Sequence, residues 1–248
     1  MTYFVDAEIV SHEKVAKDTF LLGLKSEPIT QNAQPGQFVN VRVTAGIDPL
    51  LRRPFSVFCC ENDVFYILYR LRGKGTIAMS HLKPYEKISV IGPLGKEFKL
   101  IDDNYIFVAG GIGIAPLYFF LKKENKKNIL LLYGEKSKDF LVEKILGTEC
   151  KIKVATQDGS HGFSGTVIDL LESIEIDKHT KILACGPMGM LRELKNFAAK
   201  NDLEAYGSIE VIMGCGLGAC LGCAIRTKNG IKYVCQDGPI FNLRDVEI

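Results

Sequence analysis

Apolar and polar residues alternate in short runs through the first hundred positions of the chain. Segments 38–43 (FVNVRV) and 64–69 (VFYILY) show this period of two, and Pro35-Gly36 and the glycines of segment 73–75 interrupt it. Such alternation predicts strands with one face in a core, and Pro and Gly mark the turns between strands. The pattern therefore predicts a small antiparallel β-barrel, which we assign to residues 1–102.

From about residue 104 the pattern changes, because apolar runs of strand length now alternate with helical stretches. We expect strands at 105–109, 129–133, 151–155 and 181–184, and helices at 115–123, 139–146, 166–173 and 188–200. This order is typical of a parallel sheet covered by helices, which binds ligands at the carboxyl ends of its strands. An α/β domain is therefore predicted over residues 103–205.

The last segment, 206–248, is rich in Gly and Cys and has little room for a hydrophobic core of its own. A bound ion or cluster is a natural source of stability for so small a segment. The predicted fold class is therefore α/β plus all-β, with an N-terminal antiparallel β-barrel, a central parallel sheet with flanking helices and a C-terminal Cys-rich lobe.

Four cysteines in this lobe carry the strongest chemical signal. Cys215, Cys220, Cys223 and Cys235 follow the pattern C-x4-C-x2-C-x11-C in a Gly-rich segment. The first three have the spacing of plant-type ferredoxins, and the glycines permit the positive φ angles that a loop around a [2Fe-2S] cluster needs. Four thiolates also suit structural zinc, and unligated thiols are a third reading. Zinc sites commonly use two C-x2-4-C pairs, so three ligands on one loop favour the iron–sulfur cluster.

Two loops of the α/β segment are candidates for nucleotide binding. The first contains Gly110, Gly111, Gly113 and Pro116 at a strand-to-helix turn, and the second contains Cys185, Gly186 and Pro187. Glycines let the backbone approach a pyrophosphate, and the helix N-terminus adds N–H donors. The spacing is not G-x-G-x-x-G, and tight packing would also explain these glycines. Because both loops are expected at one sheet edge, the nucleotide reading is preferred.

A third group of candidate residues lies in the barrel segment. It consists of Arg53, Pro54, Phe55, Ser56, Leu68, Tyr69, Arg70, Gly75 and Thr76. An arginine can neutralise a diphosphate, a strand-borne serine can hydrogen-bond a flavin edge, and a Gly-Thr turn can cap phosphate oxygens. Taken alone, the two arginines also fit a basic, solvated strand end.

The order of these motifs resembles that of the ferredoxin–NADP reductase superfamily, and the resemblance covers nearly the whole chain. R-P-F-S, L-Y-R, G-T, the G-P-L-G turn at 92–95, G-G-I-G-x-x-P and C-G-P follow one another. The appended cysteines with C-x-D-G-P narrow the resemblance to the electron-transfer subunits of class 1B dihydroorotate dehydrogenases. The D-G-S-x-G segment at 158–162 is also similar to that family.

The resemblance implies an oxidoreductase subunit with three cofactors. The barrel residues above would bind FAD, the two glycine loops would bind NAD, and the four cysteines would hold the [2Fe-2S] cluster. A flavin between the other two is chemically reasonable, because NAD exchanges hydride and the cluster exchanges single electrons. In this family, electrons pass from a partner FMN-containing dihydroorotate dehydrogenase catalytic subunit to NAD⁺ in de novo pyrimidine (UMP) biosynthesis. An α2β2 heterotetramer is expected, with the Cys-rich lobe at the subunit interface.

Composition and charge narrow the class of protein further. With 31 Lys+Arg against 29 Asp+Glu the net charge is +2, so no nucleic-acid or membrane partner is expected. The apolar run 105–121 contains three glycines and a proline, which argues against a transmembrane helix. The N-terminus shows no secretory signal. A cytoplasmic protein is therefore expected, in which disulfides are rare.

Two other functions and several residue roles stay open. The chain could be an NAD(P)H-linked ferredoxin or sulfide reductase subunit, or a non-redox zinc module that binds proteins. Segment 134–138 (GEKSK) mixes one acid with two bases, and an acid near the ribose would favour NAD over NADP. Cys185 could contact the nicotinamide or pack as a small hydrophobe, and Cys59, Cys60 and Cys150 are interpreted as packing residues.

Overall fold

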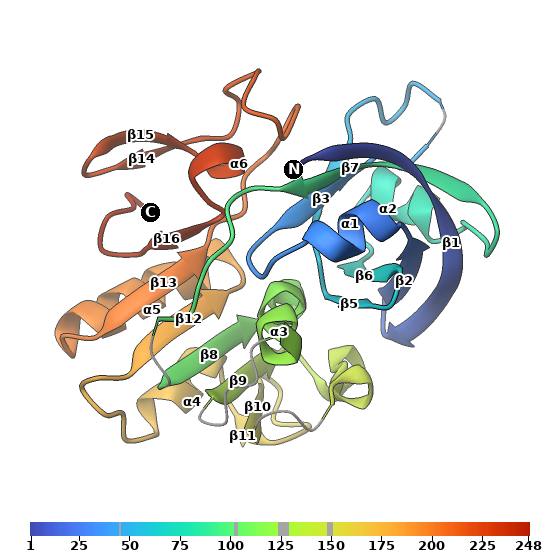
Figure 1. Ribbon diagram of the computed structural model, residues 1–248. Coiled ribbons are helices and arrows are strands. Elements are labelled where there is room, and N and C mark those ends of the chain that lie inside the picture. The colour runs from blue at the N-terminus through green and yellow to red at the C-terminus, as the bar shows by residue number, and fades with distance from the viewer. Residues whose placement is uncertain (45, 102–103, 124–128, 148–150) are drawn as a thin grey trace.

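A computed structural model describes the chain except for residues 45, 102–103, 124–128 and 148–150 (Figure 1). The N-terminal part is one antiparallel sheet in the order β4-β3-β7-β1-β2-β6-β5. Its strands are β1 (Tyr3–Ala16), β2 (Thr19–Lys25), β3 (Phe38–Val41), β4 (Arg53–Ser56), β5 (Cys59–Glu61), β6 (Val64–Arg70) and β7 (Lys87–Leu94).

This sheet curls into a half-barrel around an apolar core. Strands β4 and β6 lie far apart in the sheet order, yet Phe55 packs edge-on to Tyr69 with 5.9 Å between the ring centroids. Alternate residues such as Val39 and Val41 fill the interior. The predicted antiparallel β-structure of this part is therefore confirmed, in the form of a half-barrel.

Two short helices, α1 (Glu27–Asn32) and α2 (Lys74–Met79), interrupt the half-barrel. We expected segment 73–75 to be a turn, but α2 begins there. The hydroxyl of Thr76 accepts hydrogen bonds from the N–H groups of Arg72 and Gly73, at 2.8 and 3.2 Å. A side-chain acceptor for such N–H groups stabilises the start of a helix, so the Thr76 hydroxyl favours a helix over a turn at this position.

The second sheet has the order β11-β10-β9-β8-β12-β13-β16 and is parallel except for the last strand. Its strands are β8 (Tyr105–Gly110), β9 (Ile129–Glu135), β10 (Lys151–Thr156), β11 (Phe163–Ser164), β12 (Lys181–Cys185), β13 (Glu204–Ser208) and β16 (Ile240–Asn242). Its helices are α3 (Ile114–Lys123), α4 (Val167–Glu172) and α5 (Met188–Lys200), and the 3₁₀ turn η1 (Gly111–Gly113) precedes α3.

Helices cover both faces of this sheet, as the alternation of strands and helices predicted. Ile106 and Val108 of β8 share a core with α4 and α5, whereas Tyr105 and Phe107 share another with α3. Helix α3 lies between the sheet and the half-barrel (Figure 1). There Phe58 of the half-barrel stacks on Tyr118 of α3, with 4.4 Å between the ring centroids.

The helix expected over 139–146 is not formed. The chain makes only two 3₁₀ turns there, η2 (Lys138–Phe140) and η3 (Glu143–Ile145). The carbonyl of Asp139 accepts the N–H of Lys17 at 2.9 Å, and that of Phe140 accepts from Arg70 at 3.3 Å. Because these carbonyls bond to the half-barrel, contacts distant in sequence replace the local helix.

The C-terminal segment is built into the central sheet. Besides β16 it contains the hairpin β14 (Ala224–Thr227) and β15 (Gly230–Tyr233) and the helical turn α6 (Val234–Asp237). The boundary that we drew between 205 and 206 falls inside β13, and Tyr206 pairs with Asn242 of β16. The tail buries Cys223, Val234 and Leu243 in the core that α5 shares, because it has too few apolar residues for its own. The boundary at 102/103 lies outside the described residues.

Candidate functional site

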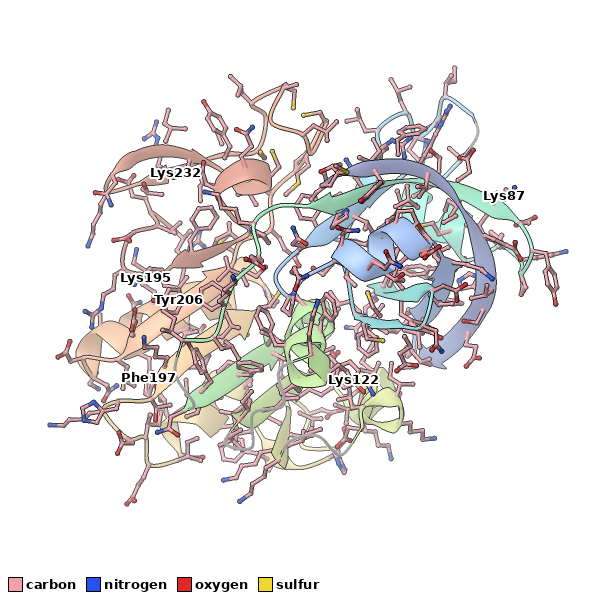
Figure 2. All side chains as sticks on the ribbon, in the orientation of Figure 1. Lys87, Lys122, Lys195, Phe197, Tyr206 and Lys232 are labelled. Carbon is pink, nitrogen blue, oxygen red and sulfur yellow. The ribbon has the colours of Figure 1, made fainter. Side chains whose placement is uncertain are left out.

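The four predicted cysteine ligands lie at one end of the molecule, in the loop before β14 and in α6. Figure 2 shows sulfur atoms gathered where this loop meets α6. The sulfurs form two pairs. The Sγ atoms of Cys223 and Cys235 are 3.2 Å apart, and Cys215 and Cys220 are joined by a side-chain hydrogen bond. A [2Fe-2S] cluster needs four thiolates, so this set of donors fits one.

Backbone N–H groups surround the sulfur of Cys215. Those of Leu217 and Cys220 donate to its Sγ at 3.3 and 3.4 Å. Burial alone would raise the pKa of Cys215, but these donors and that of Ala219 lower it to about 6. Burial and the neighbouring Cys223 raise the pKa of Cys235 to about 12. The loop thus already directs N–H groups at a thiolate, as second-shell groups do in cluster sites.

Glycines let this loop close on α6. Gly216 and Gly218 have φ angles of +72° and +83°, and a Cβ atom at Gly218 would lie 2.0 Å from Nε2 of Gln236. This agrees with the prediction that the interleaved glycines permit positive φ angles in the loop.

Within the described part of the chain, no three His, Cys, Asp or Glu side chains converge as ligands of a single metal ion.

Asn40 joins the half-barrel to the cysteine loop, a role that the sequence reading missed. It is fully buried on β3, and its Nδ2 donates to the carbonyl of Cys215 at 3.1 Å. It also stands opposite Pro54 of the R-P-F-S strand. A buried amide within an apolar strand was the available signal, because such a group needs a partner.

The predicted flavin residues of β4 and α2 come together. A Cβ atom at Gly75 would lie 3.3 Å from Nε of Arg53, so the start of α2, which carries the G-T motif, packs against the arginine of R-P-F-S. Pro54, Phe55 and Ser56 continue β4 and are partly exposed. The structure thus places two of the three proposed flavin motifs side by side, with a cation and partly exposed strand groups that suit a diphosphate cofactor.

The L-Y-R motif on β6 is used differently from our expectation. The side chains of Leu68 and Tyr69 are buried at 3% and 1% exposure. Because Nδ1 of His12 donates to the carbonyl of Leu82 at 2.8 Å, its Nε2 accepts the Tyr69 hydroxyl at 2.9 Å. Only the backbone of these two residues is therefore placed to contact a cofactor.

Arg70, the third residue of this motif, forms an ion pair with Glu135 at the end of β9. Its Nη2 and Nη1 lie 2.6 and 3.2 Å from the two carboxylate oxygens. The Glu135 side chain is only 2% exposed. The acid of segment 134–138, which we weighed as a sign of NAD rather than NADP, is therefore buried in this ion pair. Asp158, which follows β10, is exposed, and the hydroxyl and N–H of Ser160 lower the pKa of its carboxyl group.

The two glycine loops converge as predicted, through very close packing. A Cβ atom at Gly113 would lie 2.0 Å from the carbonyl oxygen of Cys185, and one at Gly110 would lie 3.0 Å from Cδ of Pro187. Gly186 likewise leaves no space beside Met190. These three glycines therefore serve the packing that we named as the alternative, and this packing also forms the predicted loop pair.

The remaining residues of these loops have distinct surroundings. Gly111 has a φ angle of +59°, which favours glycine. Pro116 lies in the first turn of α3, as predicted. Cys185 is buried, which raises the pKa of its thiol; the negative charge of Glu210 adds to this rise and a hydrogen bond with Ser208 opposes it.

Comparison with known proteins identifies the family. Residues 210–247 match the model of the iron–sulfur cluster binding domain of dihydroorotate dehydrogenase B, and residues 107–196 match an oxidoreductase NAD-binding domain. The chain is 37% identical to the dihydroorotate dehydrogenase B (NAD(+)) electron transfer subunit of Bacillus mycoides (strain KBAB4), over 96% of both chains. The chain belongs to this family. The subunit of Fusobacterium nucleatum subsp. nucleatum is 34% identical over 98% of both chains.

Solved structures of other oxidoreductases share the fold of this chain. An NADH-dependent reduced ferredoxin–NADP oxidoreductase superposes with a TM-score of 0.89 and 30% identity, over 98% of this chain and 90% of that one. The ferredoxin reductase of carbazole 1,9a-dioxygenase, at 16% identity and a TM-score of 0.70, shows the fold alone. The predicted family, its oxidoreductase class and its iron–sulfur and NAD-binding domains are confirmed. No helix in the described residues is long and apolar enough to cross a membrane.

Proposed function

We propose that the chain carries electrons from an FMN-containing dihydroorotate dehydrogenase catalytic subunit to NAD⁺ in pyrimidine biosynthesis. One observation carries the proposal: direct contacts link all three candidate sites. A hydrogen bond from Asn40 links the half-barrel to the cysteine loop. The ion pair of Arg70 links the half-barrel to the end of β9, beside the first glycine loop (residues 110–113), which we call the nucleotide turn. Bound FAD would supply the chemistry that exchanges both hydride and single electrons.

Each cofactor has a proposed set of residues in this arrangement. FAD would be held by Arg53–Ser56, by Gly75 and Thr76 at the start of α2, and by the backbone of residues 68–70. NAD would bind at Gly110, Gly111, Gly113, Pro116 and the loop Cys185–Pro187. The [2Fe-2S] cluster would be held by Cys215, Cys220, Cys223 and Cys235. The two sulfur pairs and the N–H donors at Cys215 support the cluster, and the close contact of Arg53 with Gly75 supports a diphosphate site.

The surface around the cysteine loop supports docking of the catalytic subunit there. Ile212, Leu217 and Leu221 are 89%, 49% and 51% exposed, and Leu217 and Cys235 also line part of a hollow of about 410 Å³. Apolar side chains gathered on a surface mark protein interfaces. Docking at this face would shorten the path from the cluster to the partner's flavin, in an assembly of two copies of each subunit.

The proposal is tested by co-expression with the catalytic subunit. A complex should form, the purified complex should reduce NAD⁺ with dihydroorotate, and NADH should bleach the flavin and iron–sulfur absorbance under anaerobic conditions. Leu221→Asp should weaken the complex at least ~10-fold, since a charge is costly at a buried interface. Ile101→Asp, at an exposed site before β8, is the matched control. Absence of both complex and dihydroorotate-dependent activity would refute the proposal.

The likeness to the reduced ferredoxin–NADP oxidoreductase favours a second candidate with the same cofactors. In that case the partner would be a ferredoxin-linked reductase subunit. A stable complex with such a subunit, and none with a dihydroorotate dehydrogenase, would favour this alternative.

A further inference from the structure

One ion pair joins the half-barrel to the α/β domain close to the nucleotide turn. Arg70 ends β6 and Glu135 ends β9, and two hydrogen bonds of 2.6 and 3.2 Å connect the guanidinium with the carboxylate. The side chains are 23% and 2% exposed. Two parallel hydrogen bonds fix the relative orientation of both groups, which a single contact would not do.

Further bonds hold both partners in place. Nε of Arg70 donates to the hydroxyl of Thr19 at 3.0 Å, and its Nη2 also donates to the carbonyl of Phe140 at 3.3 Å. The guanidinium carbon lies 4.9 Å from the centroid of the Phe140 ring. Glu135 accepts a further hydrogen bond from the hydroxyl of Tyr133 at 3.1 Å. Hydrogen bonds thus hold the guanidinium through Nε and both Nη atoms, which fixes its position and orientation.

The nucleotide turn lies beside this ion pair. A Cβ atom added at Gly111 would be in van der Waals contact with the pair, 3.7 Å from Nη1 of Arg70 and 3.9 Å from Oε1 of Glu135, so about one methyl group separates the turn from the pair. Two residues later, Gly113 packs against the backbone of Cys185. The turn therefore lies between the ion pair on one side and the second glycine loop on the other.

We propose that Arg70 and Glu135 are a positioning pair that sets the nucleotide turn against β6, the strand of the L-Y-R flavin motif. The inference rests on the proposed function, because NAD is taken to bind at the turn and FAD at the half-barrel. It gives the guanidinium of Arg70 a role other than that of a phosphate ligand. Hydride transfer depends on such placement, since an error of about 1 Å can slow a reaction ~10²-fold.

The first test measures how strongly the nucleotide turn is protected from amide hydrogen exchange. In Glu135→Gln, amide hydrogen exchange at residues 110–114 should become at least ~10-fold faster, because the support of the turn has lost its charged partner. Asp63→Asn is the matched control. It makes the same change of acid to amide in the exposed pair of Lys25 with Asp63, where the charged atoms are 3.0 Å apart. Wild-type exchange at the turn in Glu135→Gln would refute the proposal.

The second test separates positioning from cofactor binding. In the protein loaded with FAD and cluster, Glu135→Gln and Arg70→Lys should each slow flavin reduction by NADH ~10- to 100-fold in a single turnover. The dissociation constant of FAD should change less than about 3-fold in both. If Arg70 were a diphosphate ligand, Arg70→Lys alone would weaken FAD binding at least ~10-fold, which would overturn the assignment.

A variant with two neutral groups covers a failure of either single variant to fold. Removing one partner leaves a buried charge unpaired, whereas Arg70→Gln with Glu135→Gln leaves none. This double variant should fold and still show the faster exchange at 110–114. Protection equal to the wild type would contradict the proposal. Hydrogen exchange requires neither NADH turnover nor a partner protein. It therefore tests the positioning role of Arg70 and Glu135 even if NADH does not reduce the wild-type flavin.

Discussion

Gly113→Ala tests whether the nucleotide turn owes its position to close packing. A Cβ atom at this residue would lie 2.0 Å from the carbonyl oxygen of Cys185, 2.4 Å from its carbonyl carbon and 2.8 Å from the nitrogen of Gly186. Real Cβ atoms essentially never approach closer than 3.0 Å. The oxygen contact must therefore open by at least 3.0 − 2.0 = 1.0 Å. All three atoms belong to backbone, so no side chain can move aside.

The expected loss of stability follows from this clash. Overpacking a well-packed site costs about 1–3 kcal/mol, and contact with three backbone atoms places Gly113→Ala near 3 kcal/mol. For a chain of this size 1 kcal/mol corresponds to roughly 2–4 °C, so Tm should fall by about 6–12 °C. Gly189→Ala is the control, because nothing lies within 4 Å of its Cβ position in α5. It should stabilise the protein by up to about 1 kcal/mol.

Circular dichroism suits this measurement, since the chain contains no Trp for fluorescence. Both variants are melted with cofactors bound, and the dissociation constant of NADH is measured in parallel. Gly113→Ala should also weaken NADH binding, because the separation of the two loops disturbs the proposed site. A Tm equal to that of Gly189→Ala would refute the packing argument.

Three further variants test other parts of the molecule. Cys220→Ser should lose iron and iron–sulfur absorbance yet keep NADH reduction of the flavin, and equal loss of both activities would contradict the separation of the sites. Asn40→Ala should destabilise the protein by about 1 kcal/mol and shorten the lifetime of the cluster in air, since it removes the bond to Cys215; an unchanged lifetime would show that this bond does not hold the loop. Asp169 has its pKa lowered by the N–H and hydroxyl of Thr166, so its stabilisation is present above the unfolded pKa of 3.8 and is lost as the pH falls through the lower folded value. Asp169→Asn should therefore be less stable than the wild type in urea at neutral pH but not at strongly acidic pH, and a difference independent of pH would contradict this.

Local signals in the sequence determined most of the strands and helices and the spacing of the cysteine ligands. The helix predicted over 188–200 has those bounds in the structure, because its apolar period and its start after Pro187 are properties of neighbouring residues. The cysteine spacing likewise predicted the cluster lobe, since three ligands share one short loop. Such features need no knowledge of distant contacts.

Only the tertiary structure decided how the charged and buried polar residues are used. Arg70 and Glu135 are 65 residues apart. The sequence reading assigned Arg70 to the flavin and left the acid of segment 134–138 without a defined role, whereas the ends of β6 and β9 bring the two together. Asn40 and Cys215 are 175 residues apart. Hydrophobic periodicity shows which face of an element is buried but not which element covers it. An arginine beside a glycine turn therefore has the sequence signature of a phosphate ligand, and only the structure shows that a buried carboxylate is the partner of this one.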